Sequence, residues 1–241
     1  AWSKPEPLVE RKLIRGVTER IDYKGQILVP LHHAEVEQTV NELMGEGVEA
    51  IAVSLLWSFL NPVHEQWIHD QIKRTHPATY VALSSAVSPT LGEFERTNAT
   101  ILSAYLGPAA RHDIGAIKNL FTAQGFARPL LVMQSNGGTM WDEVVADRPL
   151  NVLSSGPVGG IVGCAKLGEQ LGYQDIVATD MGGTSFDVGV IVGSRPLISD
   201  MSVLNRYRIA LPQIENMSIG AGGGSIAWVD PATKELQVGP Q

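Results

Sequence analysis

The sequence predicts an α/β fold in which helices lie on the faces of β-sheets. Residues 48–57 (VEAIAVSLLW) form a near-continuous apolar run, which is typical of a strand buried in a parallel sheet. Asn61-Pro62 then offers a cap and a first-turn proline to a helix over 63–74, and another short strand is predicted at 80–84. This alternation of strand and helix indicates a sheet covered by helices.

The chain begins with a segment rich in proline and charge, residues 1–25, which we expect to be an arm with a short strand around 13–17. Residues 26–29 predict a further short strand. A helix is predicted over 33–45, because its apolar residues recur at helical spacing and glycines end the pattern.

The middle of the chain predicts two successive helices and a strand. Residues 90–106 have helical spacing, and Gly107-Pro108 is expected to start a second helix that runs to 124. Residues 130–134 (LLVMQ) predict a buried strand, followed by the loop Ser135-Asn136-Gly137-Gly138. Ligands of open α/β sheets bind at the carboxyl ends of strands, so this loop is a candidate site, although a plain turn explains it equally well.

Residues 153–171 (LSSGPVGGIVGCAKLGEQL) predict a helix that is rich in small side chains. Each glycine inside a helix costs about 1 kcal/mol relative to alanine. We therefore expect another backbone to pack closely against this face, as in a helix that crosses a domain interface and would also suit a hinge.

Residues 176–192 (IVATDMGGTSFDVGVIV) predict a β-hairpin suited to binding phosphate. Its strands flank Asp180 and a turn that contains Gly182, Gly183, Thr184 and Ser185, with a second acid at Asp187. Glycine lets backbone N–H groups approach phosphate oxygens, the hydroxyls add donors, and Asp180 can hold a Mg²⁺ that bridges phosphates. An ordinary hairpin with a two-glycine turn is the alternative, but it leaves both aspartates unexplained.

A second glycine-rich stretch, Gly220-Ala221-Gly222-Gly223-Gly224-Ser225, follows a short strand predicted at 217–219. Strand patterns at 225–229 and 235–238 predict a hairpin after it. Because strands bracket the glycines so closely, they favour a loop lying against a ligand over a linker. Residues 195–207 are mixed and predict no single element.

Composition excludes several classes of function. The 241 residues are 44% apolar and 18% charged, which is typical of a globular protein. The net charge of −7 argues against nucleic acid as the main partner. A single cysteine, Cys164, predicts a reducing, cytoplasmic compartment, and no apolar run is long enough to span a bilayer, so no membrane partner is expected.

Several familiar motifs do not fit. No Gly-Lys-Ser/Thr follows a glycine loop, and Ser225 stands where a dinucleotide fingerprint needs its last glycine. Asp187 occupies the position where a hydrolase nucleophile elbow needs glycine. His64 and His69 are five residues apart, which turns their side chains about 140° past a full helical turn, so no zinc site is expected there.

The motifs LLVMQSNGG, LSSGPVGGIVG, DMGGTSFDV and SIGAGGGSIAWVD occur in this order, and NPVHE and FERTNATILSAYLGP precede them. Together they resemble the ATP-dependent hydantoinase/5-oxoprolinase family (hydantoin utilization protein A-like) of the actin, sugar-kinase and Hsp70 ATPase superfamily. The resemblance covers nearly the whole chain. It implies an α/β fold of actin-like (ribonuclease H-like) ATPase lobes, with mixed sheets flanked by helices.

By this resemblance, residues 1–150 would be the C-terminal part of the first lobe with an entering arm. Residues 151–175 would be the connecting small-residue helix, and 176–241 the start of the second lobe. The first phosphate hairpin of the family, Asp-x-Gly-Gly-Thr, and the continuation after the Val-Gly-Pro motif are missing. We therefore expect this chain to be a fragment of a longer polypeptide that does not turn over ATP alone.

The resemblance also implies an activity. ATP, with Mg²⁺ or Mn²⁺, would activate the oxygen of a small cyclic amide (hydantoin, 5-oxoproline or lactam), and water would open the ring. Asp180 would be the catalytic, metal-associated acid, and the remaining cofactor-binding residues would be Gly182, Gly183, Thr184, Ser185, Asp187, Gly222, Gly223 and Gly224. The partner would be a subunit of the hydantoinase B type, with a homo-oligomer as a further possibility.

Other functions compete with this hypothesis. Related acetone and acetophenone carboxylases use ATP to join bicarbonate-derived carbon to a ketone. A non-enzymatic ATP switch of the actin or Hsp70 type is a third alternative, which Ser135-Asn136-Gly137-Gly138 disfavours because chaperone patterns lack it. A sugar kinase is less expected, because the sequence offers no candidate catalytic base in a sugar-kinase context.

Overall fold

The structure is a computed structural model that describes residues 6–126, 128–204 and 206–239. The described chain divides into two compact units, neither of which is continuous in sequence. The first unit runs to Val132 and also takes in Met140–Leu150 and Asp200–Leu211. The second unit contains Met133–Thr139, Asn151–Ser199 and the chain from Pro212 on.

The first unit contains most of the helices. Its elements are η1 (Arg11–Leu13), β1 (Arg20–Ile21), β2 (Ile27–Val29), α1 (His33–Gly45), β3 (Ala50–Val53), α2 (Val63–Thr75), β4 (Tyr80–Leu83), α3 (Ser84–Val87), α4 (Glu93–Ala123), α5 (Asp142–Val145), β11 (Ser202–Leu204) and β12 (Tyr207–Ile209).

The second unit is built mainly from strands. Its elements are α6 (Ser155–Leu171), β7 (Ile176–Met181), β8 (Phe186–Val192), β9 (Arg195–Pro196), β10 (Ile198–Ser199), β13 (Gln213–Ile214), β14 (Asn216–Ile219), β15 (Ile226–Val229) and β16 (Leu236–Gly239). Three short elements, β5 (Leu131–Met133), β6 (Thr139–Trp141) and η2 (Pro149–Val152), contain residues of both units.

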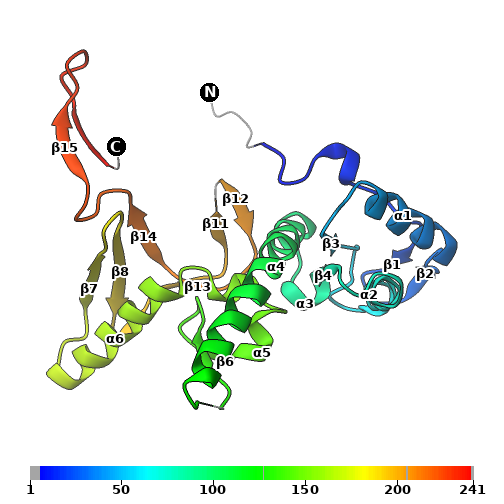
Figure 1. The fold of residues 1–241 in the computed structure, drawn as a ribbon, viewed down its shortest axis with the longest axis horizontal. Coiled ribbons are helices and arrows are strands. Elements are labelled where there is room, and N and C mark those ends of the chain that lie inside the picture. Colours follow the sequence, from blue (N-terminus) through cyan, green and yellow to red (C-terminus); the bar gives the residue numbers. More distant parts are fainter. Residues whose placement is uncertain (1–5, 127, 205, 240–241) are drawn as a thin grey trace. The chain divides into compact units, whose positions relative to one another are not determined.

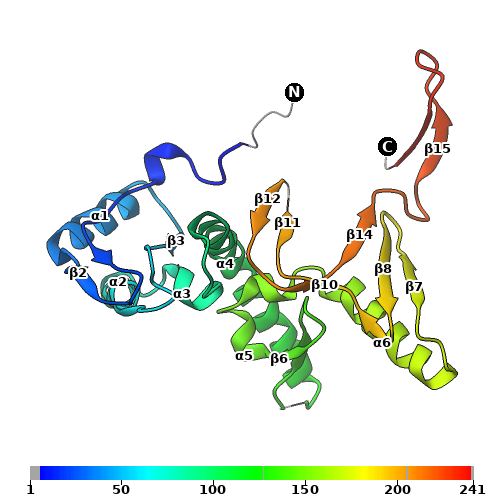
Figure 2. The same cartoon turned by 180° about the vertical axis from the view of Figure 1, so that it is seen from behind.

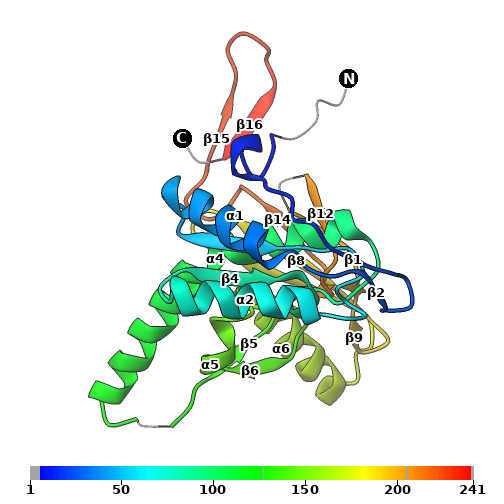
Figure 3. The ribbon, with the colours of Figure 1, turned by 90° about the vertical axis from the view of Figure 1, so that its right-hand side faces the viewer.

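The core of the first unit lies around the parallel pair of strands β3 and β4. Figure 3 shows α1 and α2 next to each other beside these strands. One apolar cluster joins the two helices and the two strands: Leu31, Val36, Val40, Ile51, Val53, Ile68, Ile72 and Leu83. The predicted strand–helix–strand arrangement is confirmed, because α2 connects the two parallel strands.

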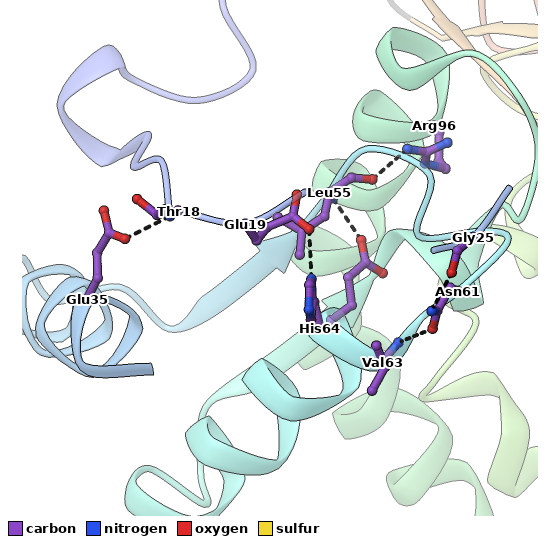
Figure 4. Close-up of polar contacts among 10 residues, drawn as sticks. Thr18, Glu19, Gly25, Glu35, Leu55, Asn61, Val63, His64 and Arg96 are labelled. Atoms are coloured by element: carbon purple, nitrogen blue, oxygen red, sulfur yellow. Dashed lines mark hydrogen bonds and ion pairs between the residues drawn. The ribbon is translucent and has the colours of Figure 1, made fainter. Parts of the chain in front are cut away.

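Polar side chains fix the loops around this core. Figure 4 shows the buried pair Glu19 and His64, with Oε2 and Nδ1 2.8 Å apart, and the Arg96 Nη2–H group, which donates to the Leu55 carbonyl oxygen at 2.8 Å. In the same view Asn61 Oδ1 accepts from the Val63 N–H group at 3.2 Å, but α2 begins at Val63 with Pro62 as its N-cap, so the predicted pair of cap and first-turn proline lies one residue too early. His64 is buried and faces Glu19, whereas His69 is half-buried and faces Asp70, so the two histidines of α2 diverge as expected.

The strand predicted around 13–17 is wrong. The helical turn η1 ends at Leu13, and the first strand is β1, which pairs antiparallel with β2. The reason is burial, since Ile21 in β1 is fully buried and Ile14 is 48% exposed.

The helix restart predicted at Gly107-Pro108 is also wrong, because α4 continues through both residues from Glu93 to Ala123. A residue before proline normally avoids the helical conformation, since its Cβ and N–H clash with the proline ring. Gly107 has no Cβ, and it packs against the ring of Tyr80. Tertiary packing therefore keeps the helix continuous where local preference predicts a break.

Residues 130–134 do not form the predicted buried strand. β5 pairs with β6 as a two-stranded hairpin, and Leu131 is 60% exposed. The Ser135-Asn136-Gly137-Gly138 segment is the turn of this hairpin, closed by the Gln134 N–H group, which donates to the Gly138 carbonyl oxygen at 2.8 Å. The segment is thus a hairpin turn, and its role as a ligand site stays a prediction.

The second unit is organised around a four-stranded antiparallel sheet in the order β14-β8-β7, with β9 also paired to β8. Figures 1 and 2 show α6 running obliquely beside β7 and β8. The helix packs on one face of the sheet through a cluster of Val158, Ile161, Ala165, Ala178, Ile191 and Ile214. The predicted hairpins over 176–192 and 225–238 are both confirmed.

An α/β fold with helices on sheet faces is thus confirmed. Among the described residues, none of the helices combines the length and the apolar character needed to cross a membrane. The assignment of residues 1–150, 151–175 and 176–241 to lobes and a connecting helix stays a prediction.

Candidate functional site

The candidate site lies at the turn of the β7–β8 hairpin, residues 182–185, which we call the hairpin turn. The antiparallel register sets Asp180 directly opposite Asp187. Residues directly opposite each other in an antiparallel pair project from the same face of the sheet. The two predicted carboxylates therefore lie side by side where the strands enter the turn, Asp180 exposed and Asp187 half-buried.

Both aspartates line a hollow of ≈ 140 Å³ between the hairpin and α6. The helix contributes Pro157, Gly160, Ile161 and Cys164, and the strands contribute Ala178, Thr179, Asp180, Asp187 and Gly189. A Cβ placed on Gly160 would meet no atom within 4 Å, so the small residues of α6 leave this space open.

This openness changes the interpretation of the small-residue helix. Close packing of another backbone was expected, yet within the described chain Gly156, Gly160 and Gly163 have no heavy atom near their Cβ positions. Gly168, near the end of α6, packs tightly against Ile176. Of these glycines Gly160 borders the hollow, and the hinge role stays a prediction.

The aspartate pair fits a magnesium ion that arrives with a phosphate ligand. Opposed like charges destabilise a strand pair, and none of the ion pairs of the described residues involves Asp180 or Asp187. The described residues also contain no group of three or more metal-ligating side chains. Mg²⁺ commonly binds one or two carboxylates together with water and phosphate oxygens, which is what this pair offers.

The hairpin turn contains backbone N–H groups that have no backbone acceptor among the described residues. Its Gly182 N–H group donates to the Ser185 carbonyl oxygen at 3.0 Å. In the described part of the chain, the N–H groups of Gly183 and Thr184 and of Ser185 have no backbone acceptor. The Ser185 hydroxyl donates to Asp187 Oδ2 at 3.2 Å, which orients that carboxylate. The turn can therefore offer three amides and the Thr184 hydroxyl to an anion.

The glycine-rich stretch, residues 220–225 (the glycine loop), lies against this turn. Figures 1 and 2 both show the chain after β14 at the turn end of the β7–β8 hairpin. Three backbone bonds join the two segments: the Gly222 N–H group donates to Thr184 O (3.3 Å), Gly223 to Gly182 O (2.9 Å) and Gly224 to Gly183 O (2.7 Å). The structure therefore brings all of the predicted site residues together in one unit.

Sequence reasoning missed the helix side of the hollow. Pro157, Gly160 and Cys164 were not candidate site residues, although their spacing of three and four places them on one face of a helix. Small size at helical spacing is the signal that could have identified them.

Fold and site together define an α/β protein with a candidate phosphate-binding hairpin. Two family models match the chain, the hydantoinase/oxoprolinase N-terminal region over residues 2–76 and hydantoinase/oxoprolinase over residues 96–241. The chain therefore belongs to the hydantoinase/oxoprolinase family, as its motifs predict.

The individual relatives include a carboxylase subunit and a caprolactamase subunit. The chain is 38% identical to the acetophenone carboxylase gamma subunit of Aromatoleum aromaticum, over 99% of this chain and 33% of that protein. It is 36% identical to caprolactamase subunit alpha of Pseudomonas jessenii, over 97% of this chain and 34% of that protein. The chain thus spans about a third of the length of the curated relatives it matches.

A solved structure supports the same fold. The crystal structure of the ATP-dependent caprolactamase from Pseudomonas jessenii matches with a TM-score of 0.83 and 35% sequence identity, covering 100% of this chain and 35% of that one. At this level of identity and similarity the predicted α/β fold class is confirmed.

Proposed function

We propose that this chain is part of an ATP-dependent subunit that hydrolyses a small cyclic amide, such as a hydantoin, 5-oxoproline or a lactam. The observation that carries the proposal is the hairpin turn, whose unpaired amides adjoin two opposed aspartates beside a hollow. The family assignment and the 36% identity to a caprolactamase subunit support it.

In the proposed reaction, the γ-phosphoryl group of ATP passes to the amide oxygen and leaves ADP. Water then adds to the activated carbon, the C–N bond opens, and phosphate departs. The amides of Gly183, Thr184 and Ser185 would donate to phosphate oxygens, while Asp180 and Asp187 would hold Mg²⁺ or Mn²⁺, which neutralises phosphate charge. Positioning and charge neutralisation are the main contributions that such a site can make to phosphoryl transfer.

A second candidate is an ATP-dependent ketone carboxylase, favoured by the 38% identity to an acetophenone carboxylase subunit. The same hairpin turn would serve it, because both reactions begin with phosphoryl transfer from ATP. Substrate identity and a requirement for bicarbonate therefore separate the two. A non-enzymatic actin-like or Hsp70-like switch is disfavoured, because family models of enzymes match both parts of the chain.

The proposal extends to partners and compartment. The relatives above are named as subunits, which supports a neighbouring subunit of the hydantoinase B type for this protein. A homo-oligomer and a cytoplasmic location complete the proposal, the latter resting on the single cysteine.

The experiment measures ATP hydrolysis by the complete gene product together with its neighbouring subunit. The panel contains 5-oxoproline, hydantoins, lactams, and ketones with and without bicarbonate. Asp180→Asn and Asp187→Asn are compared with Glu169→Gln, a control that removes an exposed α6 carboxylate outside the hollow. We expect each aspartate variant to lose on the order of 100-fold in kcat/KM for ATP, with a higher Mg²⁺ requirement.

Stimulation by a cyclic amide without bicarbonate establishes the hydrolase. Stimulation by a ketone only with bicarbonate establishes the carboxylase instead. If Asp180→Asn and Asp187→Asn hydrolyse ATP like the control, the hairpin turn is not the phosphate site.

A further inference from the structure

The glycine loop touches the hairpin turn backbone to backbone, with no space for a side chain between them. A Cβ placed on Gly222 would lie 2.7 Å from each of three backbone atoms, Gly182 O, Gly183 C and Ser185 N. A Cβ on Gly224 would lie 2.9 Å from Gly183 O. Neither glycine has a positive φ, so close approach rather than backbone conformation is what requires glycine here.

Each of the three hydrogen bonds across this contact also occupies a backbone N–H donor of the glycine loop. The N–H groups of Gly222, Gly223 and Gly224 donate to carbonyl oxygens of the turn. These amides therefore cannot donate to a phosphate without breaking the contact. The glycine loop lies beside the candidate phosphate site, but its own backbone donors face the protein.

Peptide geometry links these bonds to the donors of the turn. In a trans peptide the C=O of one residue and the N–H of the next lie in one plane and point in opposite directions. The accepting carbonyls belong to residues 182, 183 and 184, so their peptide partners are the N–H groups of Gly183, Thr184 and Ser185. These are the same three amides that have no backbone acceptor among the described residues. Each bond from the loop thus fixes the direction of one amide, pointing it away from the loop.

We propose that the glycine loop is the positioning element of the phosphate site, and that Gly222 is its central positioning residue. The loop holds the hairpin turn so that three successive amides converge on a phosphate group, and it makes no phosphate bond of its own. This inference rests on the proposed function in taking the phosphates of ATP as the ligand. The geometry of the contact does not depend on that function.

The test uses the complete gene product with its neighbouring subunit and compares Gly222→Ala with Gly220→Ala. Gly220 is the matched control, because it lies in the same loop and a Cβ there would meet no atom within 4 Å. Affinities for Mg·ATP and for adenosine are measured by calorimetry. We expect Gly222→Ala to weaken Mg·ATP binding at least 10-fold and to leave adenosine affinity within about twofold, while Gly220→Ala changes neither.

Hydrogen exchange followed by mass spectrometry supplies a second readout. Without nucleotide, amides 222–224 of the wild type and of Gly220→Ala are expected to be protected, and Gly222→Ala is expected to lose that protection. On adding Mg·ATP, amides 183–185 become protected in the wild type and not in Gly222→Ala. The nucleotide-free measurement tests the contact even if the protein binds no ATP, which would overturn the proposed function but not the contact.

Two results overturn the positioning role. An equal loss of ATP and adenosine affinity in Gly222→Ala shows that the loop contacts the nucleoside instead. Unchanged ATP affinity in Gly222→Ala, or unprotected amides 222–224 in the wild type, shows that the loop does not hold the turn.

Discussion

Asp142 is a buried carboxylate that keeps its charge through two partners. Its side chain is 1% exposed, and Oδ2 lies 2.7 Å from Lys118 Nζ. The other oxygen, Oδ1, accepts from the Leu130 N–H group at 3.1 Å. The Lys118 hydrogen bond lowers the pKa of Asp142 from its ordinary value, while burial acts in the opposite direction.

The lowered pKa predicts how stability depends on pH. Since the folded state binds the proton less tightly than the unfolded state, Asp142 stabilises the protein fully above an ordinary carboxyl pKa of about 4. That contribution is lost as the pH falls from there through the lower folded pKa. We therefore expect Asp142→Asn to lower the urea midpoint at pH 7 and to reduce its decline between about pH 5 and pH 3, measured by tryptophan fluorescence.

Lys118→Met is the control for this prediction, because it removes the partner and leaves the carboxylate in place. In that variant the pKa of Asp142 rises toward its ordinary value, so the gap between the folded and unfolded pKa narrows and the acid-induced loss of stability becomes smaller than in the wild type. A parallel pH dependence in the wild type and Asp142→Asn would contradict the argument.

At the residue scale, the candidate site residues that lie beside a turn could be predicted from the sequence. Contacts between segments that are distant in the sequence could not. Asp180 and Asp187 were found because carboxylates at both ends of a glycine turn are a local pattern. The role of Gly222 could not be predicted, because its N–H group donates to the carbonyl oxygen of Thr184, which is far away in the sequence. Only the folded chain shows that its donor is already used.

At the scale of elements, helix α4 shows how packing overrides local preference. Pro108 lies inside this 31-residue helix, preceded by a glycine that faces the Tyr80 ring. Tyr80 is 4% exposed, and its hydroxyl donates to the Ala146 carbonyl oxygen at 2.8 Å, so the ring has little freedom to move aside. The sequence predicts a break here because the signals for Gly-Pro are local and Tyr80 is not.

Two glycines of α4 give opposite predictions. A Cβ on Gly107 would overlap the Tyr80 ring, so Gly107→Ala is expected to destabilise the helix by about 1–3 kcal/mol through overpacking. A Cβ on Gly115 would meet no atom within 4 Å, so Gly115→Ala is expected to stabilise it by about 0.5–1 kcal/mol through helix propensity. Hydrogen exchange of the α4 amides measures both changes, and shifts of the same sign in the two variants would refute the packing argument.

Elements with a strong internal pattern were predictable and short ones were not. The bounds of α1 match the predicted 33–45, and the β7–β8 hairpin matches the predicted 176–192. The described residues of the segment 195–214 form five strands of two or three residues, which lack the length for a detectable alternation. Such strands form because a paired strand, either the next one in the chain or, for β10 and β13, a more distant one, shares their hydrogen bonds.

At the scale of the whole molecule, the fold class could be predicted but the compact units could not. Alternating strands and helices indicate an α/β fold wherever they occur along a chain. Each unit, however, is assembled from separated segments, such as Asp200–Leu211 in the first unit and Asn151–Ser199 in the second. The composition does not change where the chain passes from one unit to the other. No local signal in the sequence therefore divides the chain as its contacts do.

The proposed function makes a prediction at this scale, that substrate-stimulated ATP hydrolysis needs the neighbouring subunit. The relatives at 38% and 36% identity are named as subunits, and the chain covers 33% and 34% of them. Positioning a substrate carbonyl against the γ-phosphate and excluding water require surfaces on several sides of the reacting group. We expect the complete gene product alone to bind Mg·ATP but to release phosphate at no more than about 1% of the rate of the assembled enzyme with saturating substrate, a loss typical of misplaced reactants.

Steady-state phosphate release with and without the neighbouring subunit checks this prediction, and Asp180→Asn separates assembly from catalysis. The variant is expected to assemble like the wild type on size-exclusion chromatography, since Asp180 borders a hollow of its own unit, and to keep its roughly 100-fold loss in kcat/KM for ATP in the complex. Equal substrate-stimulated rates for the isolated gene product and the complex would mean that the catalytic surfaces belong to one polypeptide. The hairpin turn would then act with other parts of its own chain, and the neighbouring subunit would have a role outside ATP chemistry.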